Sequence, residues 1–153
     1  MASVEDRLGE LGITLPEAAA PAANYVPWVR SGNIVYVSGQ ISRDASGLIL
    51  GRLGDDVDAA AGADAARTCG LQLIAQVKAA CEGDLDRLVR VVKLTGFVNS
   101  APGFTDQPKV VNGCSDVFVE VFGDKGRHAR SAIGVAALPL GVAVEVEGVF
   151  EIA

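Results

Sequence analysis

The sequence is poor in the side chains from which most metal centres are built. Its 153 residues contain one histidine and three widely spaced cysteines, Cys69, Cys81 and Cys114. One imidazole and no Cys-x-x-Cys pair provide neither a zinc ligand set nor a disulfide framework. We therefore expect no metal site and reduced cysteines, with Cys69 and Cys114 in the core and Cys81 more exposed.

Positive charge is also scarce. Thirteen lysines and arginines stand against nineteen aspartates and glutamates, which gives a net charge of −6. Because phosphate neutralisation dominates nucleic-acid affinity, this balance argues against a nucleic-acid or anionic-membrane partner. No run reaches the roughly 18–20 apolar residues of a membrane span, and the acidic start MASVEDRLGELGI lacks the signal-peptide pattern. These features predict a cytoplasmic protein.

Aromatic residues make up only 5% of the chain, although 50% of its residues are hydrophobic. The apolar mass is therefore alanine, valine, leucine and isoleucine. The length is typical of one domain, which buries about 70% of its unfolded surface on folding. An apolar surplus on so small a domain favours self-association, because one core cannot hide all of it.

The first 24 residues are predicted to form a short helix and an irregular lead-in. Ser3 and Asp6 have the spacing of a capping box, and Gly12 is a suitable helix stop. The following stretch, PEAAAPAA, is too short to separate two domains. We therefore treat residues 1–153 as a single domain.

The rest of the chain alternates between strand and helix patterns. Strand-like segments are 25–29, 34–40, 88–98, 130–137 and 142–150, the first two joined by a Ser-Gly-Asn turn. Two helices are expected, over 58–81 with a polar row at i, i+4 that includes Gln72 and Gln76, and from a cap at Asp106 to Gly123. This order predicts an α+β domain with a sheet covered on one face by two helices.

Cationic side chains gather in one stretch of this acidic protein. Lys125, Arg127, His128 and Arg130 lie within seven positions, at the start of a predicted strand. A guanidinium donates two parallel hydrogen bonds to a carboxylate, which makes Arg130 a candidate anion site. His128 can reach the rim of such a site, and the charges of its arginine neighbours should disfavour its protonation. The alternative is a solvated loop that makes surface ion pairs.

Glu145 is the second candidate. In VAVEVEGVF the alternation places Glu145 and Glu147 on one face of a strand and Val144 and Val146 on the other. This pattern is also typical of the polar face of a half-buried strand. If that face is covered, a carboxylate there needs a partner and has a raised pKa.

Four stretches in order resemble one protein family. The most specific is HARSAIGVAALPLGVAVEVEG, in which a small residue, Arg and Ser precede Leu-Pro and an apolar-Glu-apolar strand. Upstream come NIVYVSGQI, with Ser-Gly-Gln at its end, VVKLTGFVNSAPGF, and the helix-like KVVNGCSDVFVEVFG. Together they resemble the RidA/YjgF family of imine/enamine deaminases over nearly the whole chain from Tyr25. Its members are also labelled endoribonuclease or translation inhibitor.

The resemblance implies a chorismate mutase-like fold, a homotrimer with active clefts between neighbouring subunits, and no cofactor. Carried over by position, Arg130 would anchor the substrate carboxylate and Glu145 would activate the attacking water. The residues implied to bind substrate beside them are Tyr25, Ser38, Gly39, Asn112, Ser131 and, through its backbone N–H, Ala132.

Several positions depart from the family pattern. His128 stands where Pro or Ala is usual, and Ala132 where many members have cysteine. The residues on either side of Tyr25 differ too, and the chain has the extra N-terminal helix. The changed rim leaves the substrate open, whereas Arg130 is retained.

Three functions are therefore compared. The leading hypothesis is cofactor-independent hydrolysis of 2-imino or enamine acids of the 2-aminoacrylate type to 2-oxo acids and ammonia, for which positioning and a proton acceptor suffice. The alternative is a non-catalytic trimer that binds a small carboxylate such as a 2-oxo acid. Ribonuclease activity fits this acidic chain poorly.

Overall fold

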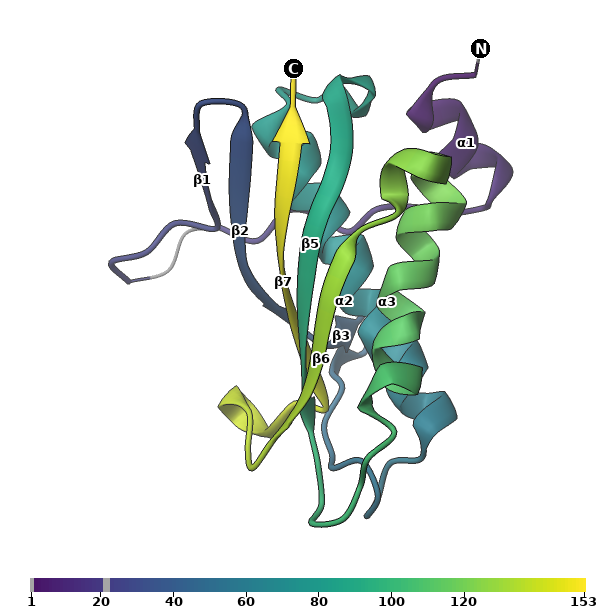
Figure 1. Cartoon of the computed structure of the whole chain (residues 1–153), viewed down its shortest axis with the longest axis vertical. Coiled ribbons are helices and arrows are strands. Elements are labelled where there is room, and N and C mark those ends of the chain that lie inside the picture. The colour runs from purple at the N-terminus through teal and green to yellow at the C-terminus, as the bar shows by residue number, and fades with distance from the viewer. Residues whose placement is uncertain (1, 21–22) are drawn as a thin grey trace.

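The computed structural model describes residues 2–20 and 23–153 and consists of one sheet backed by helices (Figure 1). The helices are α1 (Val4–Glu10), α2 (Ala59–Ala80) and α3 (Gln107–Phe122). The sheet contains β1 (Trp28–Ser31), β2 (Ile34–Ile41), β5 (Leu88–Asn99), β6 (Ala129–Val135) and β7 (Val144–Ile152), in the order β1-β2-β7-β5-β6. A hairpin of β3 (Arg43–Asp44) and β4 (Gly47–Leu48) lies outside it and was not predicted.

The sheet is mixed because α3 connects β5 to β6. A helical crossover brings the chain back in the same direction, so β5 and β6 pair in parallel, with Leu94 opposite Arg130. The other pairs are antiparallel, and β7 runs between β2 and β5. This connection places β6 at an edge of the sheet, beside α3 (Figure 1).

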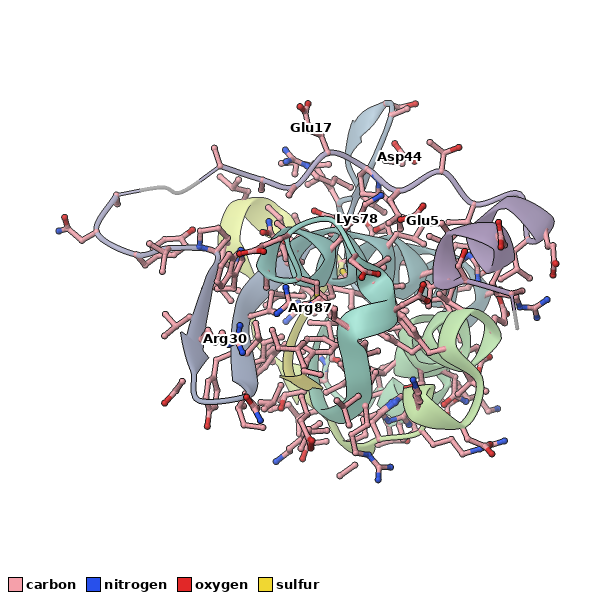
Figure 2. The ribbon with its side chains drawn as sticks, turned by 90° about the horizontal axis from the view of Figure 1, so that it is seen from above. Glu5, Glu17, Arg30, Asp44, Lys78 and Arg87 are labelled. Carbon is pink, nitrogen blue, oxygen red and sulfur yellow. The ribbon has the colours of Figure 1, made fainter. Side chains whose placement is uncertain are left out.

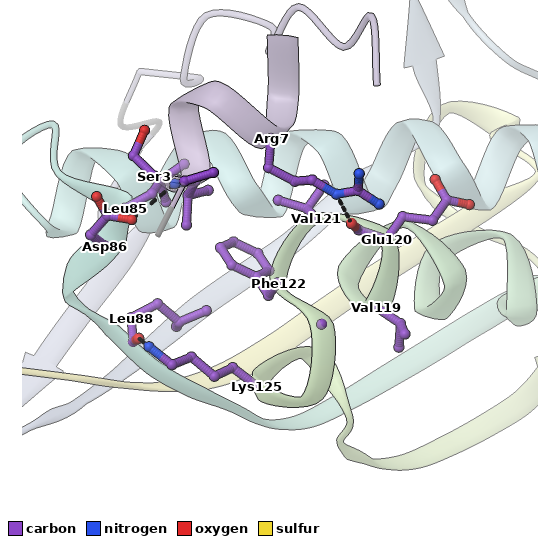
Figure 3. Close-up of a pocket in the computed structure, with 13 residues that line it drawn as sticks. Ser3, Arg7, Leu85, Asp86, Leu88, Val119, Glu120, Val121, Phe122 and Lys125 are labelled. Carbon is purple, nitrogen blue, oxygen red and sulfur yellow. Dashed lines mark hydrogen bonds between the residues drawn. The ribbon is translucent and has the colours of Figure 1, made fainter. Parts of the chain in front are cut away.

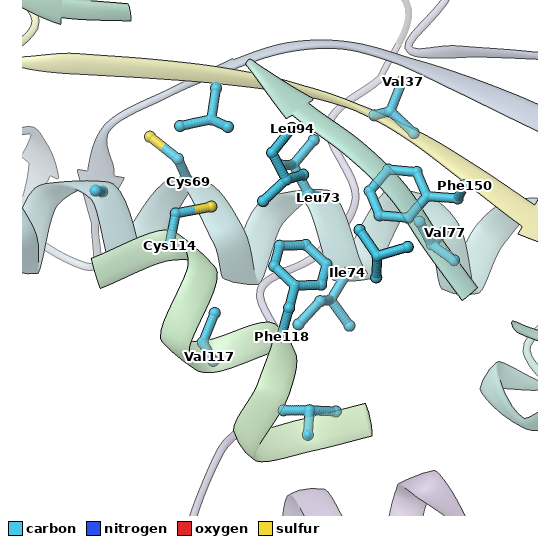
Figure 4. Close-up of a cluster of buried hydrophobic side chains, with 14 of the residues drawn as sticks. Val37, Cys69, Leu73, Ile74, Val77, Leu94, Cys114, Val117, Phe118 and Phe150 are labelled. Atoms are coloured by element: carbon cyan, nitrogen blue, oxygen red, sulfur yellow. The ribbon is translucent and has the colours of Figure 1, made fainter. Parts of the chain in front are cut away.

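The helices α2 and α3 cover one face of the sheet, which confirms the predicted α+β arrangement (Figure 1). Alternate residues of β7, from Val144 to Ile152, point into the core between the two layers. Figure 4 shows this core, where Phe118 of α3 and Phe150 of β7 stack at 5.8 Å between ring centroids. The helices approach closely because Gly113 of α3 has no Cβ, which would overlap the Ala63 carbonyl of α2.

The opposite face of the sheet has no helix over it among the described residues. Apolar side chains remain exposed in the strands, including Val29, Tyr36, Val89 and Ile133. An apolar surface of this kind on one face is the usual mark of an interface. It agrees with the self-association that the composition predicts.

The predicted N-terminal helix is present with its capping box. The Ser3 hydroxyl accepts a hydrogen bond from the Asp6 N–H, and the Asp6 carboxylate accepts one from the Ser3 N–H. The helix packs on the main body, where Glu5 forms an ion pair with Lys78 of α2 at 2.7 Å (Figure 2). In addition, Arg7 Nε donates to the carbonyl of Glu120 in α3.

Three details differ from the sequence-based expectations. Gln72 and Gln76 of the polar row are buried and not exposed. Gln72 donates to the Ile41 carbonyl, and Gln76 donates to the Ala19 carbonyl in the lead-in that crosses α2. Cys81 is buried like the other two cysteines, and burial raises the pKa of all three thiols. Asp106 occupies the cap position of α3, but its side chain makes no capping hydrogen bond.

The strand and helix boundaries otherwise agree with the predictions to within a few residues. The first strand begins at Trp28 and leaves Tyr25 in the preceding turn. Among the described helices, none combines the length and apolar character that a membrane crossing requires.

Candidate active site

Arg130 lies near the start of the edge strand β6 and its side chain points to the helix side of the sheet. Its Nη1 donates to the Asn112 Oδ1 at 2.8 Å and to the Ser115 Oγ at 3.1 Å, and its Nη2 donates to the Pro108 carbonyl at 3.3 Å. All three partners belong to α3. The amino-terminal half of that helix therefore fixes the direction of the guanidinium.

These bonds leave part of the guanidinium available. A guanidinium has five N–H donors, and the three hydrogen bonds above use both protons of Nη1 and one of Nη2. The remaining donors are the Nε–H and one Nη2–H. Nε and Nη2 lie on the same edge of the plane, where they can hold both oxygens of a carboxylate. Arg130 is thus oriented by the protein and keeps two N–H donors, one on Nε and one on Nη2, for a ligand.

The Ser115 hydroxyl continues this network to the histidine. Ser115 Oγ lies 2.9 Å from His128 Nε2, and His128 Nδ1 lies 2.6 Å from the carbonyl oxygen of Gly126. Burial lowers the pKa of His128, the hydrogen bond to Gly126 opposes this shift, and the charge of Arg130 adds to it. The expected effect of a neighbouring arginine on His128 is therefore present, but it is secondary to burial.

The groups around Arg130 line an open surface hollow of about 300 Å³. Its walls come from α3 and from the segment that enters β6, and its lining is Ser115, Asp116, Val119, Arg127, His128 and Arg130. Two arginines and one carboxylate give the hollow a net positive character within an acidic chain. The cationic stretch around Arg130 therefore forms a hollow within one chain, and its use as an anion site stays a prediction.

Glu145 lies in β7 on the other face of the sheet. It pairs with Ile41 of β2 and with Phe97 of β5, and its side chain is half-buried. Burial raises the pKa of Glu145 above its usual range, and the nearby charge of Glu147 raises it further. A carboxyl group with this shift titrates closer to neutral pH, as a proton acceptor in catalysis needs.

Gly39 and Ser38 lie beside Glu145 in an irregular part of β2. The pairing register between β2 and β7 shifts between Val37 and Gln40, so Ser38 and Gly39 bulge out of the ladder. A Cβ at Gly39 would overlap the Glu145 carboxylate, which shows how closely the two residues approach. The Ser38 hydroxyl donates to the Val26 carbonyl and so connects the bulge to the segment that contains Tyr25.

Tyr25 is largely exposed, with 60% of its surface accessible. Its ring is therefore free to contact a ligand or another chain near the bulge. Together, Tyr25, Ser38, Gly39 and Glu145 form one group of the predicted site residues. Arg130 and Asn112 form a second group.

The two groups lie on opposite faces of the sheet in one chain. Arg130 pairs with Leu94, which is buried under the helices, whereas Glu145 pairs with Phe97, three residues along β5. Residues an odd number apart in a strand point to opposite faces. Ala132 falls on the helix face with Arg130, and Ser131 on the open face with Glu145. One chain therefore contains two separate groups of the predicted site residues, which are called the two half-sites below.

Ser115 is the residue that the sequence reasoning missed. It lies one helical turn after Asn112, so its side chain shares that residue's face of α3 and reaches Arg130. The i, i+3 spacing of two hydrogen-bonding side chains on a predicted helix is the signal that points to it. Among the residues that the structure describes, no group of His, Cys, Asp and Glu is arranged to hold a metal ion.

The two largest hollows described lie away from these groups. One, of about 350 Å³, separates α1 from the carboxyl end of α3 and is lined by Arg7, Asp86, Phe122 and Lys125 among others (Figure 3). Its cationic groups are engaged, since Arg7 binds the Glu120 carbonyl and Lys125 the Leu88 carbonyl. The other, of about 490 Å³, lies beneath the lead-in and is mainly apolar. Neither contains a residue of the two half-sites.

Comparison with known proteins gives a consistent result. The family model described as "YjgF/chorismate mutase-like, putative endoribonuclease" matches residues 5–151. Protein TCP17 of Trypanosoma cruzi is 53% identical over 151 residues, which cover 97% of this chain and 94% of TCP17. A 2-iminobutanoate/2-iminopropanoate deaminase of Dermatophagoides farinae is 29% identical over 139 residues, covering 90% of this chain and 92% of the deaminase.

The fold is similarly matched by a solved structure. The crystal structure of Atu1372 from Agrobacterium tumefaciens, a protein of unknown function, superposes with a TM-score of 0.91 at 48% identity. The match covers 98% of this chain and 92% of Atu1372. The similarity of fold therefore extends over nearly the whole chain.

Proposed function

This chain is a member of the YjgF/RidA family with its chorismate mutase-like α+β fold, and on this basis we propose that it hydrolyses small 2-imino acids and their enamine tautomers to 2-oxo acids and ammonia. The similar deaminase of Dermatophagoides farinae acts on substrates of this class, according to its name. The observation that carries the proposal is the pair of unused N–H donors on Nε and Nη2 of Arg130, a side chain that α3 holds inside a hollow of net positive character.

The substrate class follows from the chemistry of the two half-sites. A 2-imino acid has a carboxylate next to an electrophilic C=N carbon. The Nε and Nη2 protons of Arg130 bind the carboxylate and so fix the position of that carbon. Glu145 then needs to lie within reach of a water molecule on the other side of the imine. The Gly39 backbone, next to Glu145, is available to the substrate nitrogen.

The proposed reaction is a hydrolysis that depends on proton transfer between water, Glu145 and the imine nitrogen. Ionised Glu145 accepts a proton from water as the water oxygen bonds to C2 and the π electrons of C=N move to the nitrogen. Glu145 then passes this proton to the nitrogen and is ionised again. The tetrahedral carbinolamine then loses ammonia when its C–N bond breaks, as the hydroxyl proton is transferred through Glu145 to the leaving nitrogen. One water enters, one ammonia leaves, and no atom changes its oxidation state overall.

The arrangement of the half-sites makes the assembly part of the proposal. Arg130 and Glu145 lie on opposite faces of one sheet, so a single protomer cannot bring both to one small substrate. A ring of three protomers places the edge strand of one beside the bulge of the next. The YjgF family typically forms trimers, and we propose that this chain does so, with each cleft formed by Arg130 of one subunit and Glu145 of its neighbour.

The test is a coupled hydrolysis assay with a serine dehydratase that generates 2-aminoacrylate from serine. Wild-type protein is expected to accelerate formation of pyruvate and ammonia over the spontaneous rate. Arg130→Ala is expected to lose this acceleration while the oligomer persists. Arg67→Ala is the matched control, because Arg67 forms only an exposed ion pair with Glu120. Equal activity of wild type and Arg130→Ala would refute the proposal.

The second candidate, a non-catalytic binding protein for 2-oxo acids, is favoured by one observation. The Arg130 hollow is complete within one chain, whereas the proton acceptor is not part of it. Saturable pyruvate binding that depends on Arg130, without turnover of any imino acid in a panel, would support this candidate over the enzyme.

A further inference from the structure

Three side chains form a directed line of hydrogen bonds that runs from His128 through Ser115 to the Nη1 group of Arg130. His128 Nδ1 faces the Gly126 carbonyl at 2.6 Å, and a carbonyl only accepts, so Nδ1 has the proton. In the neutral ring Nε2 is then an acceptor, and the Ser115 hydroxyl donates to it at 2.9 Å. With its proton used in this way, the Ser115 oxygen presents lone pairs to Arg130 Nη1 at 3.1 Å.

This direction depends on the charge state of His128. A protonated ring donates from both nitrogens, so Nε2 can no longer accept the Ser115 proton. The hydroxyl then has to turn its proton elsewhere, and its oxygen receives donors from both the ring and Arg130. Two cations would also be connected through one hydroxyl, a repulsion that the half-buried surroundings strengthen.

We propose that Ser115 and His128 are positioning residues for Arg130: neutral His128 orients the Ser115 hydroxyl, which holds the guanidinium in its carboxylate-binding direction, and protonation of His128 releases it. The consequence is a carboxylate site that weakens in mild acid. This inference rests on the proposed role of Arg130 as carboxylate anchor. Its core, the coupling of Arg130 to the His128 proton, can be observed without any substrate.

The charged surroundings of His128 support this role. Asp116 of α3, Arg127 of the segment before β6 and Arg130 of β6 itself all line the same hollow. From β5, Arg90 donates to the Arg127 carbonyl behind the ring. Burial and the charge of Arg130 lower the pKa of His128, so the ring is neutral at neutral pH and titrates on the acid side of its usual range.

The His128 ring is held in place on two sides. Phe118 packs edge-on against the imidazole at 6.2 Å between centroids, and the Gly126 carbonyl fixes its tautomer. The tautomer selected in this way is the one that can accept from Ser115. Asn112 provides Arg130 with a second, uncharged partner that does not titrate.

The test uses four proteins that all have Glu145→Gln, which removes the other titration on the acid side. One keeps the native Ser115 and His128, and the other three add Ser115→Ala, Ser115→Thr or His128→Phe. Pyruvate is the probe, and its dissociation constant is measured by NMR titration between pH 5 and 7.5. For the unaltered network we expect roughly a fivefold loss of affinity as His128 protonates, the effect of about one hydrogen bond. The midpoint should equal that of the His128 ring signals.

The variants separate positioning from a merely structural effect. Ser115→Ala and His128→Phe should bind pyruvate more weakly at pH 7.5 and show no pH dependence, whereas Ser115→Thr retains the hydroxyl and should behave as wild type. A pH dependence that survives in His128→Phe would overturn the inference. Equal, pH-independent affinity in all four proteins would also overturn it.

A second measurement keeps this inference apart from the proposed function. The side-chain ¹⁵N and proton signals of Arg130 are followed in the free protein over the same pH range. A shift of the Nη1 protons with the His128 midpoint, absent in Ser115→Ala, supports the coupling even if the protein has no deaminase activity. Arg130 signals that do not respond to His128 protonation would refute the coupling even in an active enzyme.

Discussion

Gly39 lies directly against the carboxylate of Glu145. A Cβ at position 39 would overlap Oε2 and come within van der Waals radius of the rest of the carboxyl group. The glycine is located where the pairing of β2 with β7 is interrupted, so the backbone bends toward the acid. Any other residue type at position 39 would require the Glu145 carboxylate to move from this place.

The first prediction concerns this contact. Gly39→Ala should displace the Glu145 side chain and lower the imine-hydrolysis rate by about a hundredfold or more, the usual contribution of a positioned proton acceptor. Gly9→Ala in α1, where a Cβ meets nothing, is the control for adding a methyl group. Pyruvate binding at Arg130 should survive in the oligomer. A Gly39→Ala protein with full activity would exclude Glu145 as the proton acceptor.

The second prediction is the pH dependence of activity. Hydrolysis needs ionised Glu145, and burial together with Glu147 raises the pKa of this carboxyl. The value of kcat/KM should therefore fall as pH drops through a midpoint above the usual range of a glutamate. Glu147→Gln removes the smaller cause and should move this midpoint down without abolishing activity. A midpoint unchanged in Glu147→Gln would contradict the assignment.

The third prediction concerns the change of folding stability with pH at Glu145. This change has the opposite sign from that of an acid in a salt bridge. A raised pKa means that the folded protein holds the Glu145 proton more tightly than the unfolded chain does. Stability therefore decreases as pH rises from the unfolded pKa through the folded one, and the penalty is complete above it. Glu145→Gln should raise Tm at neutral pH and lose this advantage near pH 4.

The control for this effect is Glu151→Gln, which makes the same charge change on the same face of β7. Thermal unfolding at pH 4 and pH 7.5 compares the two variants with wild type. A neutral-pH gain equal in both variants would show that net charge, and not the environment of Glu145, is responsible.

Much of this fold was predictable because its boundaries are set by local chemistry. The Ser3 capping box and the left-handed Gly123 after α3 both occur where the sequence places them, and α2 begins next to the predicted residue 58. Each is a contact between residues a few positions apart. The burial of Gln72 and Gln76 was not predictable in this way, because their partners, the carbonyls of Ile41 in β2 and of Ala19 in the lead-in, are distant in the chain.

The separation of the half-sites has the same origin. Periodicity shows that Glu145 and Glu147 share one face of the sheet, but it does not show whether Arg130 lies on that face. That depends on the register of β6 against β5 and of β5 against β7, which puts Arg130 opposite Leu94 and Glu145 opposite Phe97. A change of register by one residue would place both side chains on one face. Register is a property of the assembled sheet.

The last prediction follows from this geometry and tests the shared cleft. Arg130→Ala and Glu145→Gln should each be inactive alone, yet regain activity when the two chains are assembled together. In a cyclic trimer that takes its arginine from one subunit and its glutamate from the next, each mixed ring contains one site with both residues intact. Random mixing at equal amounts thus gives about one quarter of the wild-type sites.

The measurement is the hydrolysis rate of coexpressed chains purified through two different tags, so that only mixed oligomers are assayed. Such rings should have about one third of the wild-type activity per trimer. Mixing the purified homo-oligomers without exchange of subunits is the control and should remain inactive. If Arg130 and Glu145 acted from the same chain, every site in the mixed oligomer would lack one of them. Inactive mixed oligomers would therefore place both residues in one protomer, in conflict with their positions on opposite faces of the sheet.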